Sequence, residues 1–143
     1  SFDINSSGMT AQRYRMDIIS ENVANANTTR TEDGTPYRRK VVTFQEKGSQ
    51  TNFSHVLNKA TDKYSGTGVK VSGVHEDMTT DMNMVYDPSH PDADENGYVT
   101  YPNVNIITEM TNLIDASRGY EANATAFEAT KSVALKGLSL IET

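Results

Sequence analysis

The last part of the chain, residues 102–143, decides the fold and reads PNVNIITEMTNLIDASRGYEANATAFEATKSVALKGLSLIET. Apolar residues recur in it every seven positions, and a weaker companion row accompanies them. No proline follows Pro102, and alanine, leucine, glutamate and lysine supply good helix propensity. The pattern predicts one helix of about 37 residues, about 55 Å long at a rise of about 1.5 Å per residue. The two rows form a heptad-like seam of Ile106, Leu113, Tyr120, Phe127, Ala134 and Ile141 with Met110, Ser117, Ala124, Lys131 and Leu138.

The beginning of the chain carries a second helical pattern with the same spacing. It predicts an amphipathic helix over residues 4–26, about 35 Å long. Asn5, Ser6 or Ser7 is expected to cap its start, and the polar run after residue 25 is expected to end it. Its apolar positions are Phe2, Met9, Met16 and Val23, with Ile19 and Ala26 on the companion row.

Two arrangements cover these apolar stripes. In one, the helices form an antiparallel pair inside a single monomeric core. In the other, helices of neighbouring subunits complete the pair. Apolar residues outside the seam make the arc broader than a two-helix contact uses, and this favours the second arrangement. These residues are Ile18, Ile107, Ile114 and Val133.

Between the helices the sequence predicts a small β-rich unit, so the fold class is α+β. Strands are expected over residues 37–46, 68–77, 81–86 and 98–101, where apolar residues alternate and turn residues flank them. Residues 47–66 are expected to be a variable insertion. The predicted division is therefore an N-terminal helix and motif (1–30), a central β-rich domain (31–102) and a C-terminal helix (103–143).

Composition excludes several classes of protein. The net charge of −6 argues against a primary role in nucleic-acid binding. Cysteine is absent, so disulfides, thiol catalysis and cysteine zinc sites are excluded. No apolar stretch reaches the length of a membrane span, and no cleavable secretory signal is visible. No catalytic constellation stands out either, so we expect neither an enzyme nor a cofactor.

The acidic loop 87–97 is the best match to a ligand site. Its residues 92–97, DADENG, resemble the start of a calcium loop. Position 12 would be Asn103, which lacks a bidentate carboxylate, and Pro88 and Pro91 stand where a helix is required. We therefore expect a tight acidic turn and no metal ligands, although a soluble metal- or ligand-binding module using this loop remains the alternative function.

Two smaller features have similarly plain interpretations. His90 is expected to be a solvated or turn-packing histidine and not a metal ligand. The basic run Arg38, Arg39 and Lys40 is expected to be a solvated strand edge or a salt-bridging patch against an acidic neighbour.

Three stretches resemble the bacterial flagellar basal-body rod proteins of the flagellar axial family. They are SGMTAQRYRMDIISENVANANTTRT (7–31), PYRRKVVTF (36–44) with VYDPSHPDADENGYVTYPNVN (85–105), and EMTNLIDASRGYEANATAFEATK (109–131). The central stretch is closest to proximal-rod members. The resemblance covers nearly the whole chain except residues 47–66. Its motif residues here are Asn22, Ala24, Asn25, Thr28, Thr29, Arg118, Tyr120 and Asn123.

The resemblance implies a structural subunit whose terminal helices pair as a coiled coil and line the axial tube. It also implies synthesis in the cytoplasm, export through the flagellar type III apparatus and assembly into the rod that crosses the periplasm. The implied partners are other rod proteins, further copies of the chain and rod-base components, without nucleic acid or membrane insertion. Five residues at the end of the first helix are expected to fix register between neighbours, with simple C-capping as the alternative: Asn22, Asn25, Asn27, Thr28 and Thr29. The predicted subunit interface comprises Met9, Met16, Ile19, Val23, Ile106, Met110, Leu113, Tyr120, Phe127, Leu138 and Ile141.

Overall fold

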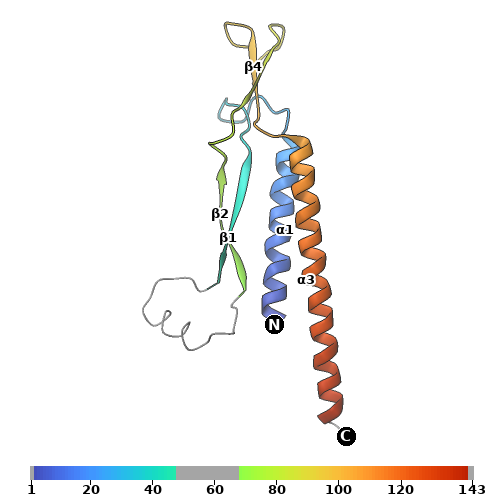
Figure 1. Ribbon diagram of the computed structural model, residues 1–143. Helices are drawn as coiled ribbons and strands as arrows, with labels where there is room; N and C mark the ends of the chain where they lie inside the picture. The colour runs from blue at the N-terminus through green and yellow to red at the C-terminus, as the bar shows by residue number, and fades with distance from the viewer. Residues whose placement is uncertain (1, 48–67, 142–143) are drawn as a thin grey trace, which may run out of the picture. The chain divides into compact units, whose positions relative to one another are not determined.

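The computed structural model describes residues 2–47 and 68–141, and it confirms the α+β class. Apart from residue 47, the predicted insertion lies outside the described residues. In chain order, four short strands lie between the two helices that Figure 1 labels α1 and α3. In chain order the elements are α1 (Phe2–Ala24), β1 (Lys40–Glu46), β2 (Val69–Glu76), β3 (Asn83–Tyr86), β4 (Tyr98–Tyr101) and α3 (Ile106–Ile141).

The two helices begin differently from the prediction. Helix α1 already starts at Phe2, so the prediction that Asn5, Ser6 or Ser7 caps it is wrong. Ser7 has another task, because its Oγ donates to the Ile4 carbonyl at 2.8 Å and accepts from the Val69 N–H at 3.1 Å. Helix α3 begins just after Asn105, whose Oδ1 accepts from the Thr108 N–H as an N-cap.

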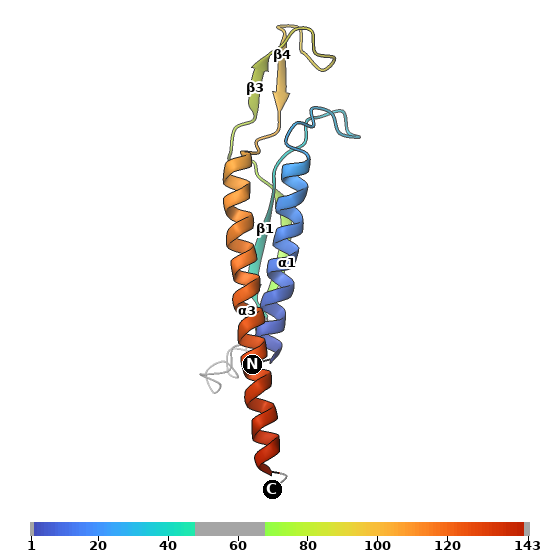
Figure 2. The same cartoon turned by 90° about the vertical axis from the view of Figure 1, so that its right-hand side faces the viewer.

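The described residues group into two compact units, and both helices contribute to each. The first unit contains Ser1–Tyr14, Thr43–Gly73 and Ala116–Thr143, and the second contains Arg15–Val42 and Val74–Asp115. Within each unit, the segment of α1 lies beside a segment of α3 that runs in the opposite direction (Figures 1 and 2). Within the described ranges, neither helix has an apolar stretch that would suit a membrane span.

The strands form two separate two-stranded sheets, β1 with β2 and β3 with β4. Figure 2 shows β3 and β4 side by side, and they are antiparallel with Val85 opposite Val99 and Tyr86 opposite Tyr98. The first strand starts three residues later than predicted. Its expected first residue, Tyr37, is instead held in the preceding turn, where its N–H donates to the Thr28 carbonyl at 3.0 Å.

The buried interior is small and unusually polar. Its apolar members include Ala11, Ile19, Tyr37, Val99 and Ala116. Almost as many buried residues are polar, namely Ser7, Asn22, Asp77, Asn103 and Glu109. Since a small apolar core provides limited stability, the hydrogen bonds of these polar residues carry much of the fold's specificity.

Candidate functional site

Helix α3 carries many apolar side chains that are exposed to solvent in the single chain. Of its predicted seam residues, Leu113 and Phe127 are half-buried, while Ile106, Met110, Tyr120, Leu138 and Ile141 are exposed. Apolar residues outside the seam are exposed as well, among them Ile107 (80%), Ile114 and Val133. Large exposed apolar patches on a protein mark surfaces that bind a partner, so these side chains make α3 the candidate interface.

Helix α1 is more deeply packed than α3. Its buried face consists of Ser7, Ala11, Ile19 and Asn22. The other predicted seam residues, Met9, Met16 and Val23, are half-buried. The chain therefore covers much of α1 by itself, whereas α3 has more apolar surface left to offer a partner.

Two glycines set the spacing of the helices in the first unit. A Cβ atom at Gly8 would lie 2.6 Å from Oδ1 of Asn123, and one at Gly119 would lie 3.1 Å from Cδ of Gln12. Asn123 is fixed there, since its Nδ2 donates to the Gly119 carbonyl at 2.8 Å. The C-terminal motif residues Gly119 and Asn123 thus face α1, while Arg118 and Tyr120 of the same motif are exposed.

The close approach at Gly8 predicts that Gly8→Ala changes the free energy of unfolding in opposite directions with and without the Asn123 side chain. Gly8→Ala should destabilise the chain by about 1 kcal/mol, because the added methyl displaces the Asn123 amide. In an Asn123→Ala background, Gly8→Ala should stabilise the chain by about 1 kcal/mol, because alanine is favoured over glycine by about this amount inside a helix. Urea unfolding followed by circular dichroism measures both values.

Gly137→Ala is the matched control for this pair, because nothing lies within 4 Å of a Cβ atom there. It should stabilise α3 in either background. Equal effects of Gly8→Ala with and without Asn123 would contradict the proposed contact.

Asn22 of the N-terminal motif is a buried hydrogen-bonding centre. Its Nδ2 donates to the Lys40 carbonyl at 2.9 Å, and its Oδ1 accepts from the Lys40 N–H at 2.9 Å and from the Tyr37 hydroxyl at 2.7 Å. Burial, followed by the charges of Glu21 and Glu109, raises the pKa of Tyr37 to about 12. The hydroxyl therefore stays protonated and donates throughout the neutral range.

The remaining N-terminal motif residues close the turn after α1. Asn25 Nδ2 donates to the Glu21 carbonyl, and Thr28 Oγ1 donates to Asn25 Oδ1. Thr29 Oγ1 reaches further along the chain and donates to Asp92 Oδ2 at 2.6 Å. Ala24 is exposed at the last turn of α1. These bonds give the residues partners within the chain, and their role in register between neighbours stays a prediction.

A charged cluster in the second unit was missed by the sequence analysis. We call Arg39, Asp77, Asn103 and Glu109 the Arg39 cluster. The Arg39 guanidinium pairs with Glu109 Oε1 and, at 3.1 Å, with Asp77 Oδ2. Asn103 Oδ1 accepts from the Arg39 N–H at 2.7 Å, and its Nδ2 donates to the Asp77 carbonyl at 3.0 Å. The cluster joins the entrance of β1, the exit of β2 and the first turns of α3.

Burial and ion pairing shift the pKa of Arg39 in opposite directions. Burial alone would lower the pKa of Arg39, but hydrogen bonds and charge from Glu109 and Asp77 raise it overall. The predicted basic run is thus a salt-bridging patch within the chain, since Lys40 Nζ also pairs with Glu21 at 2.6 Å.

The pKa of Asp77 gives a prediction for acid stability. Hydrogen bonds from the Thr80 hydroxyl and N–H, opposed by burial and aided by Thr79, hold this pKa well below the ordinary 3.8. The carboxylate then stabilises the folded chain fully above about pH 4, and this contribution is lost as the pH falls below it. Asp77→Asn should remove that dependence in urea unfolding between about pH 4 and pH 2.

Thr80→Val tests the cause of the Asp77 shift. It removes only the hydroxyl donor, so the pKa of Asp77 in the folded chain should rise, and the stability lost between about pH 4 and pH 2 should be smaller than in the unaltered chain. An unchanged acid profile in both variants would contradict the assignment to Asp77.

The carboxylates of the acidic loop are engaged in its own turns. Asp94 Oδ1 accepts from the N–H groups of Asn96 and Tyr98, both at 2.9 Å. Asp92 pairs with Arg30 at 2.5 Å and accepts from Thr29. The Thr29 hydroxyl, opposed by partial desolvation and aided by Arg30, lowers the pKa of Asp92. Across the described residues, no three His, Cys, Asp or Glu side chains are grouped to hold a metal ion, so nothing favours the alternative function.

His90 packs in the same loop, as predicted. Its Nδ1 accepts from the Asp92 N–H at 3.0 Å, and its ring stands edge-on to Tyr101.

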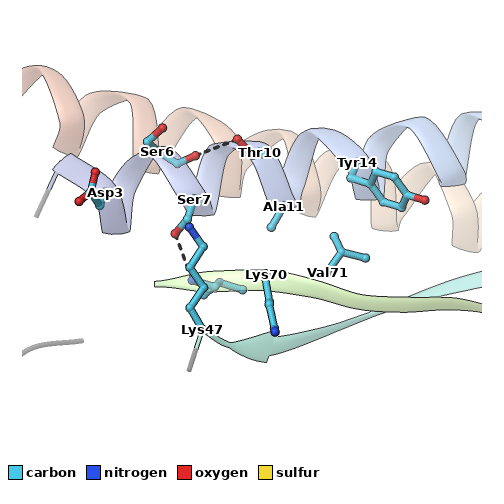
Figure 3. A pocket seen from close by; sticks show the side chains of 10 residues that line it. Asp3, Ser6, Ser7, Thr10, Ala11, Tyr14, Lys47, Lys70 and Val71 are labelled. Carbon is cyan, nitrogen blue, oxygen red and sulfur yellow. Dashed lines mark hydrogen bonds between the residues drawn. The ribbon is translucent and has the colours of Figure 1, made fainter. Parts of the chain in front are cut away.

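A groove of about 640 Å³ lies in the first unit between α1 and β2. Figure 3 shows Ser7 reaching from α1 to the backbone of β2. The helix side offers Ser6, Thr10 and Tyr14, and the strand side offers Lys47 and Lys70. Hydroxyl and ammonium groups thus line both sides of the groove.

Two protein-family profiles match the two ends of the chain. The profile described as flagella basal body rod protein matches residues 2–30. The profile described as flagellar basal body rod FlgEFG protein C-terminal matches residues 95–140. The two matches fall on α1 with its motif and on β4 with α3.

Full-length relatives carry the same name in distant bacteria. The flagellar basal-body rod protein FlgC of Bacillus subtilis (strain 168) is 46% identical, covering 98% of this chain and 95% of the relative. Its counterparts in Borreliella burgdorferi and Escherichia coli O157:H7 are 40% and 42% identical, covering 99% and 97% of this chain and 96% and 94% of the relatives. The chain therefore belongs to the FlgC family of flagellar basal-body rod proteins, the structural subunits of the rod in the flagellar basal body.

Proposed function

We propose that this rod subunit assembles through α1 and α3, with α3 supplying most of the contact to neighbouring subunits. The observation that carries the proposal is the row of exposed apolar side chains along α3, which the chain itself leaves uncovered. Burying a leucine or isoleucine side chain fully contributes about 1.5–3 kcal/mol. A few such residues per subunit are sufficient to drive assembly after the entropy of ordering is subtracted.

The interface follows from which seam residues remain accessible. Ile106, Met110, Leu138 and Ile141 are exposed and available to a neighbour. Ile19 is buried and supports the helix pair from within. Residues 1–30 and 103–143 then form the axial module, and residues 31–102 form a central part that faces outward.

The partners in this proposal are further copies of the chain, other rod proteins and rod-base components. The subunit reaches them through the flagellar type III export apparatus and assembles where the rod crosses the periplasm. The family membership supports assembly with other rod proteins, since the relatives are named as rod proteins of the basal body.

Ile107→Asp tests the assembly role of α3 most cleanly. Ile107 lies in the first turn of α3, where a carboxylate interacts favourably with the helix dipole, so the helix itself should not weaken. Incorporation of the variant into isolated basal bodies should fall at least about tenfold. The aspartate carboxylate would have to be buried unpaired in the subunit interface, and this cost weakens the contact. Swimming should be lost with it.

Thr108→Asp is the matched control, since it places the same charge on a neighbouring exposed position that carries no apolar side chain. It should assemble normally. Circular dichroism should show both variants folded. Normal incorporation of Ile107→Asp and of Ile114→Asp would refute the assembly role.

A further inference from the structure

The β3–β4 hairpin carries an exposed apolar surface that the assembly of the helices does not use. Met84, Tyr86 and Tyr98 form it, and we call it the hairpin ledge. The antiparallel register places them on one face, because Tyr86 is directly opposite Tyr98 and Met84 lies two positions from Tyr86. All three are exposed, Tyr86 by 64%.

The ledge is rigid as well as exposed. The rings of Tyr86 and Tyr98 meet edge to face with centroids 5.3 Å apart. Gly97 has a φ of +84°, and a Cβ atom there would lie 2.8 Å from the Tyr86 ring. The turn backbone therefore packs against this ring, and little side-chain entropy remains to be lost on binding.

The segment that carries the ledge is acidic. Residues 81–101 contain five acidic side chains and neither lysine nor arginine: Asp81, Asp87, Asp92, Asp94 and Glu95. Asp92 is neutralised by Arg30, while Glu95 is exposed in the turn beside Tyr98. A partner for this surface must be apolar and basic.

The far end of α3 has that complementary character. The register of Gly8 with Asn123 carries α3 past the start of α1, and we call residues 131–141 the α3 overhang (Figure 1). Every residue of the overhang is exposed. It contains Lys131 and Lys136 but no acidic residue.

Helical spacing puts each of these lysines beside apolar residues. Lys131 shares a face with Leu135 and Leu138, and Lys136 shares a face with Val133 and Leu140. Each face therefore offers two apolar side chains and one ammonium group.

We propose that the hairpin ledge of one copy docks on the α3 overhang of a second copy of this chain. The interface would join two different surfaces, so it is heterologous and open-ended, as a rod requires. The inference rests on the proposed function, because it names the group that covers one part of α3 in the assembly. Charge complementarity selects the second copy, since an acidic apolar surface and a basic apolar surface occur on the same polypeptide.

Disulfide trapping tests this contact directly, because the chain contains no cysteine. Full-length Met84→Cys and Leu138→Cys proteins are mixed and oxidised. The yield of the mixed dimer should exceed that of a Lys70→Cys and Leu138→Cys pair about tenfold or more, since contact raises the effective concentration of the thiols. Equal yields for the two pairs would overturn the proposal.

A charge exchange separates specific docking from apolar association. Lys131→Glu in the Leu138→Cys partner should lower the yield about threefold or more, because Lys131 lies on the same face as Leu138, and Glu95→Lys in the Met84→Cys partner should restore it. Failure of the second change to rescue the first would overturn the proposed pairing, as would trapping that appears only when a different rod protein is added. Loss of assembly in Ile107→Asp with background trapping would leave the proposed function intact and reject this interface alone.

Discussion

Arg39→Ala should destabilise the chain by about 3 kcal/mol in urea unfolding at neutral pH, because it leaves two buried carboxylates without their cation. The Glu109 side chain is 1% exposed and that of Asp77 is 6% exposed. Arg39 itself is about one quarter accessible to solvent, so water reaching the site limits the loss to the lower part of the range for broken buried pairs.

Removing Glu109 should cost less than removing Arg39. Glu109→Ala leaves Arg39 paired with Asp77, and it also eliminates a buried carboxylate oxygen, Oε2, that has no hydrogen-bond partner. A larger loss of unfolding free energy for Arg39→Ala than for Glu109→Ala would indicate that the cost comes from uncompensated buried charge and not from lost packing. Equal losses in the two variants would indicate packing.

Arg38→Ala is the control for this pair of variants. Arg38 precedes Arg39, and it donates a long hydrogen bond of 3.4 Å to the Asp77 carbonyl. Its removal should change the free energy of unfolding by less than about 1 kcal/mol.

Asn22→Ala should also lower the free energy of unfolding by about 3 kcal/mol, since an unpaired buried polar group costs about 1–3 kcal/mol. Asn22 is 1% exposed, and the change leaves the Lys40 N–H, the Lys40 carbonyl and the Tyr37 hydroxyl without their partner. Asn22→Asp should not rescue it, because a carboxylate oxygen would then face the Lys40 carbonyl.

A double-mutant cycle checks this mechanism. Tyr37→Phe removes one of the three groups that Asn22 satisfies, so its cost and that of Asn22→Ala should be less than additive. Asn27→Ala, at an exposed position in the turn after α1, should stay within about 0.5 kcal/mol of the unaltered chain. Strict additivity of the first two changes would contradict a shared network.

The two networks have a consequence for assembly. They fix the end of α1 and the beginning of α3 to the strands of the second unit, using hydrogen bonds and ion pairs instead of apolar area. In the proposed assembly, the apolar side chains of α3 thereby remain available to neighbouring subunits, and the subunit keeps a defined fold with a small core.

The sequence by itself determined the elements that depend on local periodicity. Repeats of seven predicted both helices, and alternation with flanking turn residues predicted the four strands, because these patterns reflect the geometry of the backbone. The excess of apolar residues such as Ile107 and Val133 over a two-helix seam also predicted a surface for partners. The start of α1 was misjudged, since Ser7 reads as a cap but serves β2.

Only the tertiary structure decided which polar residues hold the fold together. Arg39 and Glu109 are 70 positions apart, and no spacing rule links them. Asn22 reads as a helix-ending residue, yet it pairs with a strand 18 positions away. Such pairings depend on which distant segments the tertiary structure brings together. The periodicity of side chains indicates only which face of a helix or strand is buried.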